Sequence, residues 1–493
     1  MPNSGTTLVA LVGAAVVALG IGLRILALGV IPGNRKPSTG MAWLLAVLLW
    51  PVVGTALFLV LGRARLERTR HERQQRVNDV IAQRARAVVD DLPDVELPDY
   101  LPSVIRLNRA LGSLPLLGDN TVELFPDYAA TILAMAEAVE GAERFVHVEF
   151  YITAWDDVTA PLFDAMTAAA ARGVDVRLLF DHLGSKGIPG YDRLVARLDE
   201  TQIRWREMLP IAPLRGKIRR PDLRNHRKLL VVDGRVGFTG SLNLTEPGYN
   251  KPKNHKAGRQ WVELMVRVQG PIVTALEAVF AQDWFAETEE GIEVELGPPA
   301  PPAVGEGVLG DVACQLVPSG PGYPSENNLR LFTTLIYAAT QRLSITSPYF
   351  VPDESLLYAV TTAAQRGVAV ELFVSEESDQ FMVGHAQASY YRALLEAGVR
   401  IYLYPAPFIL HAKHFTVDDD IAVIGSSNMD MRSFGLNYEI SLMMLGSDVV
   451  DAMQVVQDDY RARARELTLG EWEGRSRRLK YVDNVMRLTA ALQ

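Results

Sequence analysis

The chain has 493 residues, of which 48% are hydrophobic, and a formal net charge of -9 at pH 7. This length exceeds one ordinary hydrophobic core and predicts two or three units. The single cysteine, Cys314, excludes an intramolecular disulfide and a thiolate metal cluster, and we interpret it as a small buried hydrophobic residue.

Two uncharged apolar runs open the chain. The first covers residues 7–31, interrupted only by Arg24, and the second covers residues 37–62. Each could cross about 30 Å of hydrocarbon, so residues 1–63 are predicted to form a transmembrane helical hairpin. A cleaved signal peptide is less favoured because no basic segment precedes the first run. A re-entrant hairpin stays open as an alternative, because positive charge lies at Arg24 and in the turn at 33–36.

A cluster of arginines follows the second apolar run. Six arginines and two glutamates lie between Arg63 and Arg76. The positive-inside rule places this segment, and the chain after it, on the cytoplasmic side of the membrane. We therefore expect residues 64–104 to be a basic juxtamembrane linker that lies against anionic lipid headgroups. A solvated helix face is the alternative.

An internal repeat organises the rest of the chain. Five polar residues recur at identical offsets, as His226, Lys228, Asp233, Ser241 and Asn243 and again as His411, Lys413, Asp418, Ser426 and Asn428. Upstream of each motif, helical spacing of apolar residues is followed by Gly and then by an alternating strand pattern. We predict an α/β fold of two tandem domains, residues 105–296 and 313–493, joined by a Pro-rich linker at 297–312 and packed with pseudo-two-fold symmetry.

The repeated motif has a simple geometric interpretation. Residues two apart on a strand point the same way, so His226 and Lys228 should share one face. Asp233 has the opposite parity and precedes Gly234, which predicts a turn and makes a local structural role at least as probable as direct chemistry. Two-fold packing would bring two histidines, two lysines and two asparagines into one cleft.

The pattern His-x-Lys-x4-Asp-x6-Gly-Ser-x-Asn, present twice, resembles the signature of the phospholipase D superfamily. The segments Ser347 to Asp353 and Asn428 to Phe434, and then Asn437-Tyr438-Glu439, are similar to those of bacterial cardiolipin synthases. The resemblance covers nearly the whole chain, including the apolar N-terminus. It implies two phospholipase D-like domains.

The resemblance also implies a two-step transfer through a phosphatidyl-histidine. His226 is then the expected nucleophile and His411 the general acid and base. No metal and no cofactor are implied. The further implied residues are Lys228, Asp233, Lys413 and Asp418 for catalysis, Asn243, Asn428, Ser241 and Ser426 for phosphate binding, and Glu263 and Glu439 to orient the histidines.

The motif indicates phosphodiester chemistry, and the apolar N-terminus favours a lipid substrate over nucleic acid. The resemblance implies transfer between two phosphatidylglycerol molecules, giving cardiolipin and glycerol, by a multi-pass protein of the bacterial cell membrane whose partners are anionic lipids. The alternatives are a phospholipase D that releases phosphatidic acid, a catalytically idle membrane scaffold and, least favoured, a nuclease. The oligomeric state stays open.

Overall fold

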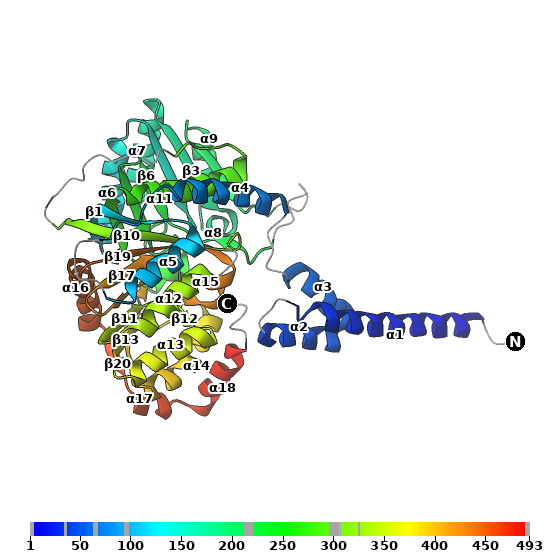
Figure 1. The fold of residues 1–493 in the computed structure, drawn as a ribbon. Helices are drawn as coiled ribbons and strands as arrows, with labels where there is room; N and C mark the ends of the chain where they lie inside the picture. The colour runs from blue at the N-terminus through cyan, green and yellow to red at the C-terminus, as the bar shows by residue number, and fades with distance from the viewer. Residues whose placement is uncertain are drawn as a thin grey trace. The chain divides into compact units, whose positions relative to one another are not determined.

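The computed structural model describes residues 4–33, 37–62, 68–92, 98–211, 220–294, 305, 307–323 and 326–488. The chain forms two compact units, Met1–Arg65 and Leu66–Gln493 (Figure 1). Most of the predicted Pro-rich linker, residues 297–304, lies outside the described residues.

The N-terminal unit contains α1 (Ser4–Val30), α2 (Pro37–Leu49) and α3 (Pro51–Leu61). Among the described helices, only α1 is long and apolar enough to cross a membrane. The second apolar run is broken because Pro51 has no N–H to continue the helix, and Trp50 leaves the helical region at φ -130° and ψ 80°. At 1.5 Å per residue α2 and α3 reach only about 20 and 16 Å, short of the bilayer core. The predicted pair of spanning helices is not confirmed, and the short helices suit the re-entrant alternative.

Polar and close contacts hold these three helices together. The Arg24 guanidinium on α1 donates hydrogen bonds of 3.1 and 3.0 Å to the Leu48 carbonyl, which the helix break leaves without an intrahelical partner. A Cβ on Gly54 would lie 2.5 Å from the Ala46 carbonyl oxygen, so α3 packs on α2 at backbone distance. Arg24 therefore has a structural partner within the apolar unit.

The second unit is built on a 16-stranded sheet, and four further strands of the unit pair in two separate two-stranded sheets. The strands of its first half are β1 (Leu116–Phe125), β2 (Phe145–Phe150), β3 (Asp175–Asp181), β4 (Arg204–Met208), β5 (Arg224–Asn225), β6 (Leu229–Val232), β7 (Val236–Gly240), β8 (Trp261–Val262) and β9 (Met265–Gln269). Those of its second half are β10 (Leu309–Ser319), β11 (Arg342–Thr346), β12 (Phe350–Val351), β13 (Ala369–Ser375), β14 (Arg400–Tyr404), β15 (Ile409–Leu410), β16 (His414–Val417), β17 (Ile421–Gly425), β18 (Met429–Asp430), β19 (Asn437–Leu445) and β20 (Arg465–Leu467).

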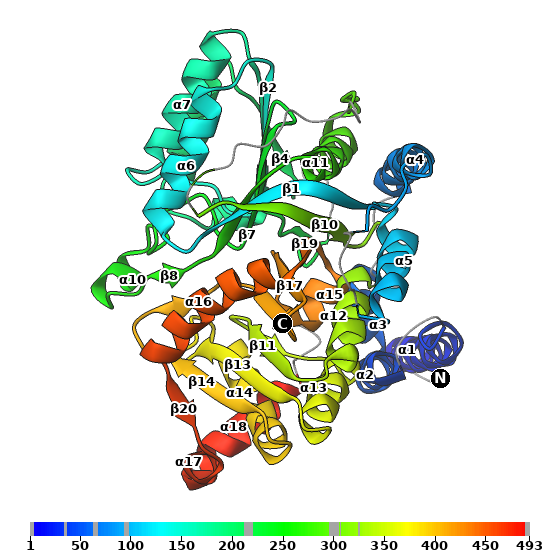
Figure 2. The ribbon, with the colours of Figure 1, turned by 60° about the vertical axis from the view of Figure 1, so that its left-hand side comes forward.

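The strand order repeats about the centre of this sheet. It runs β20-β14-β13-β11-β16-β17-β19-β10-β1-β9-β7-β6-β2-β3-β4, and β1 pairs antiparallel with β10. Reading outward from that central pair, each half follows the same order, which confirms the predicted duplication. The two halves thus share one continuous sheet (Figure 2), and its central strand β10 begins at Leu309, inside the predicted linker. Cys314 is fully buried in β10, as expected.

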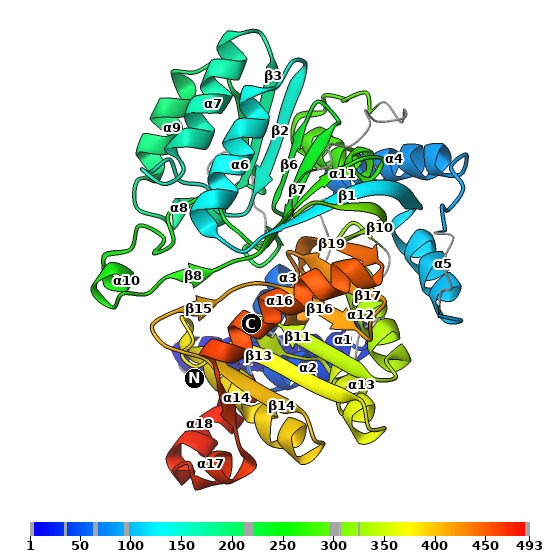
Figure 3. The same cartoon turned by 90° about the vertical axis from the view of Figure 1, so that its left-hand side faces the viewer.

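Helices cover both faces of each half. Those of the first half and its approach are α4 (Arg68–Ala85), α5 (Leu101–Gly112), α6 (Tyr128–Glu140), α7 (Ala160–Ala171), α8 (His182–Lys186), α9 (Tyr191–Asp199), α10 (Pro252–Lys256) and α11 (Ile272–Thr288). Those of the second half are α12 (Asn327–Ala338), α13 (Glu354–Gln365), α14 (Phe381–Glu396), α15 (Met431–Gly435), α16 (Ser447–Arg463), α17 (Leu469–Gly474) and α18 (Arg477–Arg487). Figure 3 shows α6 and α7 on the face of the first half opposite α11, and α16 opposite α12 and α13 in the second half.

The helix ends predicted from the repeat are confirmed. Helix α7 ends two residues before Gly173, which has φ +94°, and α13 ends two residues before Gly367, which has φ +96°. Glycine adopts this left-handed conformation without the strain of a Cβ. Past each glycine the chain enters a buried parallel strand, β3 or β13. The two glycines therefore connect equivalent helices to equivalent strands.

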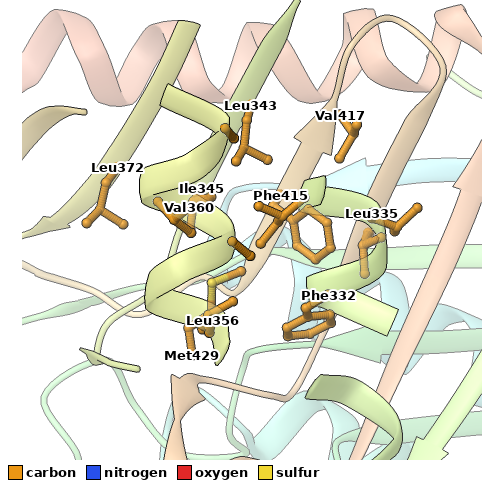
Figure 4. Packing of buried hydrophobic residues seen from close by; sticks show 14 of the residues in the cluster. Phe332, Leu335, Leu343, Ile345, Leu356, Val360, Leu372, Phe415, Val417 and Met429 are labelled. Atoms are coloured by element: carbon orange, nitrogen blue, oxygen red, sulfur yellow. The ribbon is translucent and has the colours of Figure 1, made fainter. Parts of the chain in front are cut away.

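The core of the second half lies between two helices and the sheet. Side chains from α12 and α13 pack onto β11, β13 and β16, and each fully buried one stabilises the fold by about 1.5–3 kcal/mol. Figure 4 shows the central members of this cluster, which are Phe332, Leu335, Leu343, Ile345, Leu356, Val360, Leu372, Phe415, Val417 and Met429.

Two arginines of α4 form ion pairs with carboxylates of the second unit. The Arg70 side chain is 3% exposed and forms an ion pair with Glu287 of α11, and Arg73 pairs with Glu289 just beyond that helix. The predicted juxtamembrane linker at 64–104 is therefore wrong for α4, because α4 is packed into the second unit. Two more arginines of the cluster, Arg63 and Arg65, lie outside the described residues.

Candidate active site

Each His-x-Lys segment lies between two short strands rather than within one. Strand β5 ends at Asn225 and β6 begins at Leu229, while β15 ends at Leu410 and β16 begins at His414. Strand β5 pairs with β19 of the second half, whereas β6 pairs with β2 and β7 of its own half. Strand β15 likewise pairs with β8 of the first half. The predicted strand placement of the motif is wrong, because the chain changes sheet partner there, and both motifs consequently lie where the halves meet.

Both histidines line a single cleft of about 540 Å³. His226 is 7% exposed and His411 is 5% exposed, so only a small part of each ring can meet a substrate. The ring of Tyr151 lies 4.9 Å from that of His226, and its equivalent in the second half, Tyr349, also lines the cleft. The two-fold packing expected from the repeat thus places the two histidines in one site.

A buried carboxylate from the opposite half holds each histidine. His226 Nδ1 lies 3.0 Å from both oxygens of Glu439, and His411 Nδ1 lies 2.7 and 2.9 Å from those of Glu263. A carboxylate at Nδ1 fixes the tautomer and the ring orientation, which leaves Nε2 available for chemistry. Each predicted carboxylate thus contacts the histidine of the other half, an exchange that the repeat did not indicate.

The two carboxylates have different surroundings. Glu439 also accepts hydrogen bonds from Ser426 Oγ at 2.5 Å and from Asn437 Nδ2 at 3.3 Å. Burial nevertheless raises the pKa of Glu439 to about 7. Glu263 has His411 as its hydrogen-bond partner within the described part of the chain. Glu263 is thus hydrogen-bonded to His411 and also favours the charged form of Lys413.

The histidines differ accordingly. Burial, followed by the positive charge of Lys228, holds the pKa of His226 well below its usual value. Burial also lowers the pKa of His411, but Glu263 opposes that shift. Glu263 therefore favours the protonated form of His411.

The two motif lysines are buried against their own histidines. Lys228 Nζ donates to the His226 carbonyl at 2.7 Å, and Lys413 Nζ donates to the His411 carbonyl at 2.5 Å. Burial, and next the like charge of Lys413, lower the pKa of Lys228 well below its usual value, and burial lowers the pKa of Lys413 to about 8. A phosphate bound between two such ammonium groups would offset their desolvation and repulsion. The site is thus suited to an anion.

The asparagines and serines of the motif have separate positions. Asn243 and Asn428 both line the cleft, and Asn428 Oδ1 is buried without a hydrogen-bond partner among the described residues. Ser241 Oγ instead bonds to the backbone N–H and carbonyl of Leu264, and Ser426 Oγ accepts from the Ile440 N–H at 3.0 Å. The two serines do not line the cleft. The Ser241 hydroxyl joins neighbouring backbone segments, and the Ser426 hydroxyl also donates to Glu439, so the described structure does not support their predicted phosphate contact.

The motif aspartates lie apart from the cleft. Each has a left-handed φ, 54° at Asp233 and 49° at Asp418, in the predicted turn. Their carboxylates accept backbone N–H groups at the start of the neighbouring strands, from Glu143, Arg144 and Phe145 and from Thr340, Gln341 and Arg342 respectively. The direct catalytic role is therefore corrected to the structural one, since these bonds fix β2 and β11 beside the motif strands.

Several cleft residues were not among the predicted ones. Tyr151 and Tyr349 follow equivalent strands, so the repeat could have revealed them. Lys251, Arg259 and Arg432 also line the cleft. Lys251 and Arg259 belong to a segment without a counterpart in the second copy, which leaves no repeat signal for them. In the described part of the chain, no group of three or more His, Cys, Asp or Glu side chains could hold a metal ion.

Comparison with known proteins agrees with this architecture. A family model described as "Cardiolipin synthase, PLD-like domain" matches residues 135–284 and 332–459. The cardiolipin synthase A proteins of Pectobacterium carotovorum and Serratia proteamaculans are each 34% identical to the chain, over 92% of it and 92% of their own length. Among solved structures, phosphatidylserine synthase of Haemophilus influenzae shares the fold, with a TM-score of 0.58 and 14% identity, over 79% of this chain and 99% of its own. The chain belongs to the phospholipase D superfamily, in the family of bacterial cardiolipin synthases.

Proposed function

We propose that the protein transfers a phosphatidyl group from one phosphatidylglycerol to a hydroxyl of a second, giving cardiolipin and glycerol. The observation that carries this proposal is the pair of carboxylate-held histidines that line one cleft, each with the lysine of its motif buried against it. Relatives named cardiolipin synthase A, which match 92% of the chain, support the lipid substrate.

The reaction takes two in-line steps. In the first, Nε2 of His226 attacks the phosphorus of the donor lipid, the bond from phosphorus to the glycerol oxygen breaks, and His411 gives its proton to that oxygen. In the second, the hydroxyl oxygen of the acceptor attacks phosphorus, the phosphorus–nitrogen bond breaks, and His411 takes the hydroxyl proton. Both histidines end in their starting states, so no co-reactant is needed.

The different surroundings of the histidines support this assignment of roles. The nucleophile must be neutral, and His226 is the ring whose pKa is lowered well below its usual value. The acid must hold a proton, and Glu263 favours the protonated form of His411. The two lysines and two asparagines would hold the non-bridging oxygens, whose charge must be stabilised through both transition states.

We further propose that α1 anchors the protein in the bacterial cell membrane, with its catalytic unit on the cytoplasmic side and anionic lipids as partners. The apolar stretch Leu11–Val30 and the arginines that follow the second apolar run support this arrangement. A multi-pass topology would require α2 and α3 to join as one helix across Pro51.

The test uses purified protein in phosphatidylglycerol vesicles without added metal, with lipid products followed by mass. We expect cardiolipin and glycerol from the wild type, and loss of at least about a thousandfold in His226→Ala and His411→Ala, as for removal of a nucleophile or its proton donor. His71→Ala on α4 is the matched control. Phosphatidic acid without cardiolipin would make the protein a hydrolase, and full activity in either cleft variant would contradict the two-histidine mechanism.

A further inference from the structure

The first half has an extended loop beside the cleft. Asn243 and Glu263 are 20 positions apart, whereas their equivalents Asn428 and Glu439 are 11 apart. The nine additional residues lie within the segment 247–260, which includes α10 and which we call the cleft loop. Because the equivalent segment of the second half is shorter, this loop breaks the two-fold symmetry of the site.

Backbone hydrogen bonds place the cleft loop next to His411. Its last residue, Gln260, accepts from the Ile409 N–H at 2.8 Å, and the His411 N–H donates to the Val262 carbonyl at 2.7 Å. Strands β8 and β15 pair in parallel at this point. The loop therefore borders the side of the cleft that holds the proposed acid and base.

The cleft loop is held in one shape. Tyr249 and Asn250 have left-handed φ values of 62° and 53°, which is unfavourable for a bulky residue such as Tyr. The buried side chain of Asn254 donates to the Gly248 carbonyl at 2.9 Å, and the Tyr249 hydroxyl accepts from Asn243 Nδ2 at 2.8 Å. Tyr249, two residues before Lys251, thereby ties the loop to an asparagine of the catalytic motif.

Three cations of the loop line the cleft, and they are the half-buried Lys251 and Arg259 and the exposed Lys253. Lys251 is half-buried and lines the cleft, and no carboxylate of the described chain forms an ion pair with it. Arg259 also lines the cleft, and its Nη2 lies 3.4 Å from Glu377, but its Nε is buried without a hydrogen-bond partner. Burial, and then the neighbouring Lys253, lower the pKa of Lys251. Asp379, which also lines the cleft, opposes that shift by its charge but forms no ion pair with Lys251. Lys251 is thus a partly desolvated cation without an ion-pair partner in the described chain.

The proposed reaction brings a second anion to the side of the cleft next to His411. Lys228 and Lys413 suit the phosphodiester that reacts, but the acceptor phosphatidylglycerol carries a phosphodiester of its own. That group lies one glycerol unit from the attacking oxygen, on the side of His411, which takes the proton. Resting on the proposed function, we infer that Lys251, with Arg259 beside it, binds the phosphate of the acceptor lipid. These residues would favour a lipid acceptor over water or a neutral alcohol.

The test makes two acceptors compete for the same intermediate. Phosphatidylglycerol vesicles with ethanol present yield cardiolipin from the lipid acceptor and phosphatidylethanol from the alcohol, and both are followed by mass. We expect Lys251→Gln to lower the ratio of cardiolipin to phosphatidylethanol about tenfold, the effect of losing one charge-assisted hydrogen bond. Lys251→Arg keeps the charge and should restore most of the ratio.

Lys256→Gln is the matched control, because this exposed lysine lies in the same loop but does not line the cleft. It should leave the ratio unchanged. Structural damage in Lys251→Gln would lower both products together, so an unchanged ratio overturns the inference at any total rate. Failure of the proposed function is distinguishable, since the wild type would then form phosphatidylethanol or phosphatidic acid without cardiolipin.

Discussion

At the scale of single residues, each histidine depends on a carboxylate that the other half of the chain supplies. Glu439 lies in β19, where β5 pairs next to His226, and Glu263 follows β8, where β15 pairs next to His411. Neither half can orient its own histidine. Catalysis is thus sensitive to the junction between the halves.

Glu263 should set the alkaline limit of activity. Burial lowers the pKa of His411 and Glu263 opposes that shift, so Glu263→Gln should lower the pKa further. The first step needs protonated His411, and the proton is lost as pH rises through its pKa. We expect the alkaline limb of the rate of glycerol release to move to lower pH, with a rate loss of about 10- to 100-fold.

The control for this variant is Glu396→Gln, which removes an exposed carboxylate of α14. Its pH profile should match that of the wild type. A reduced rate in Glu263→Gln with the alkaline limb unmoved would mean that Glu263 only supports the fold.

The sequence predicted the residue types of the site better than their contacts. Equal offsets in two copies identified the histidines, lysines and asparagines, because a repeat shows which residues are equivalent. A repeat does not show which copy they touch, so the exchange of Glu263 and Glu439 could not be predicted. The aspartates and serines also recur at equal offsets, but their side chains form hydrogen bonds to backbone groups around the cleft. Lys251 has no equivalent at all.

At the scale of elements, α4 is joined to α11 by a buried ion pair. Arg70 and Glu287 are 3% and 4% exposed, and Glu287 also accepts from the Leu209 N–H at 2.9 Å. Arg70→Ala would leave this carboxylate buried without its guanidinium partner. We expect a loss of about 3–5 kcal/mol in the free energy of unfolding, measured by denaturant unfolding in detergent.

Arg73 provides the matched comparison on the same helix. Its partner Glu289 is 63% exposed, so solvent screens the pair and Arg73→Ala should cost less than about 1 kcal/mol. Equal losses in the two variants would contradict the difference in burial as the cause.

The interpretation of α4 from sequence was wrong for a physical reason. A run of arginines after an apolar segment has the composition of a headgroup-binding linker, and composition carries no information on partners 200 residues away. Similarly, the second apolar run has the composition of a spanning helix. Pro51 alone divides this run into two helices. The mean hydropathy of the run does not reveal the break, because one proline hardly changes the mean. The strands and helices around the repeat were predictable because two copies of each pattern agree.

At the scale of the whole molecule, the chain separates into an apolar unit and a catalytic unit with its own sheet and cores. Removal of residues 1–65 should leave the catalytic unit folded. We expect near wild-type transfer with short-chain phosphatidylglycerol in detergent. On vesicles the rate should fall at least about tenfold, because the enzyme is no longer concentrated at the lipid surface.

Vesicle co-sedimentation measures the lost anchoring directly, and thermal unfolding checks that the shortened protein is folded. A shortened protein that still sediments with vesicles and keeps its full rate would show that the catalytic unit binds the membrane by its own surface.

The burial of the sole thiol has a practical consequence. Cys314 lies fully inside β10, and burial raises the pKa of its thiol, so the reactive thiolate is scarce and out of reach. The unmodified chain should therefore not react with maleimides or thiol-directed spin labels. A cysteine introduced at Lys256 would be the only group to react, and a fluorophore there would report lipid arriving at the cleft loop in an otherwise native enzyme.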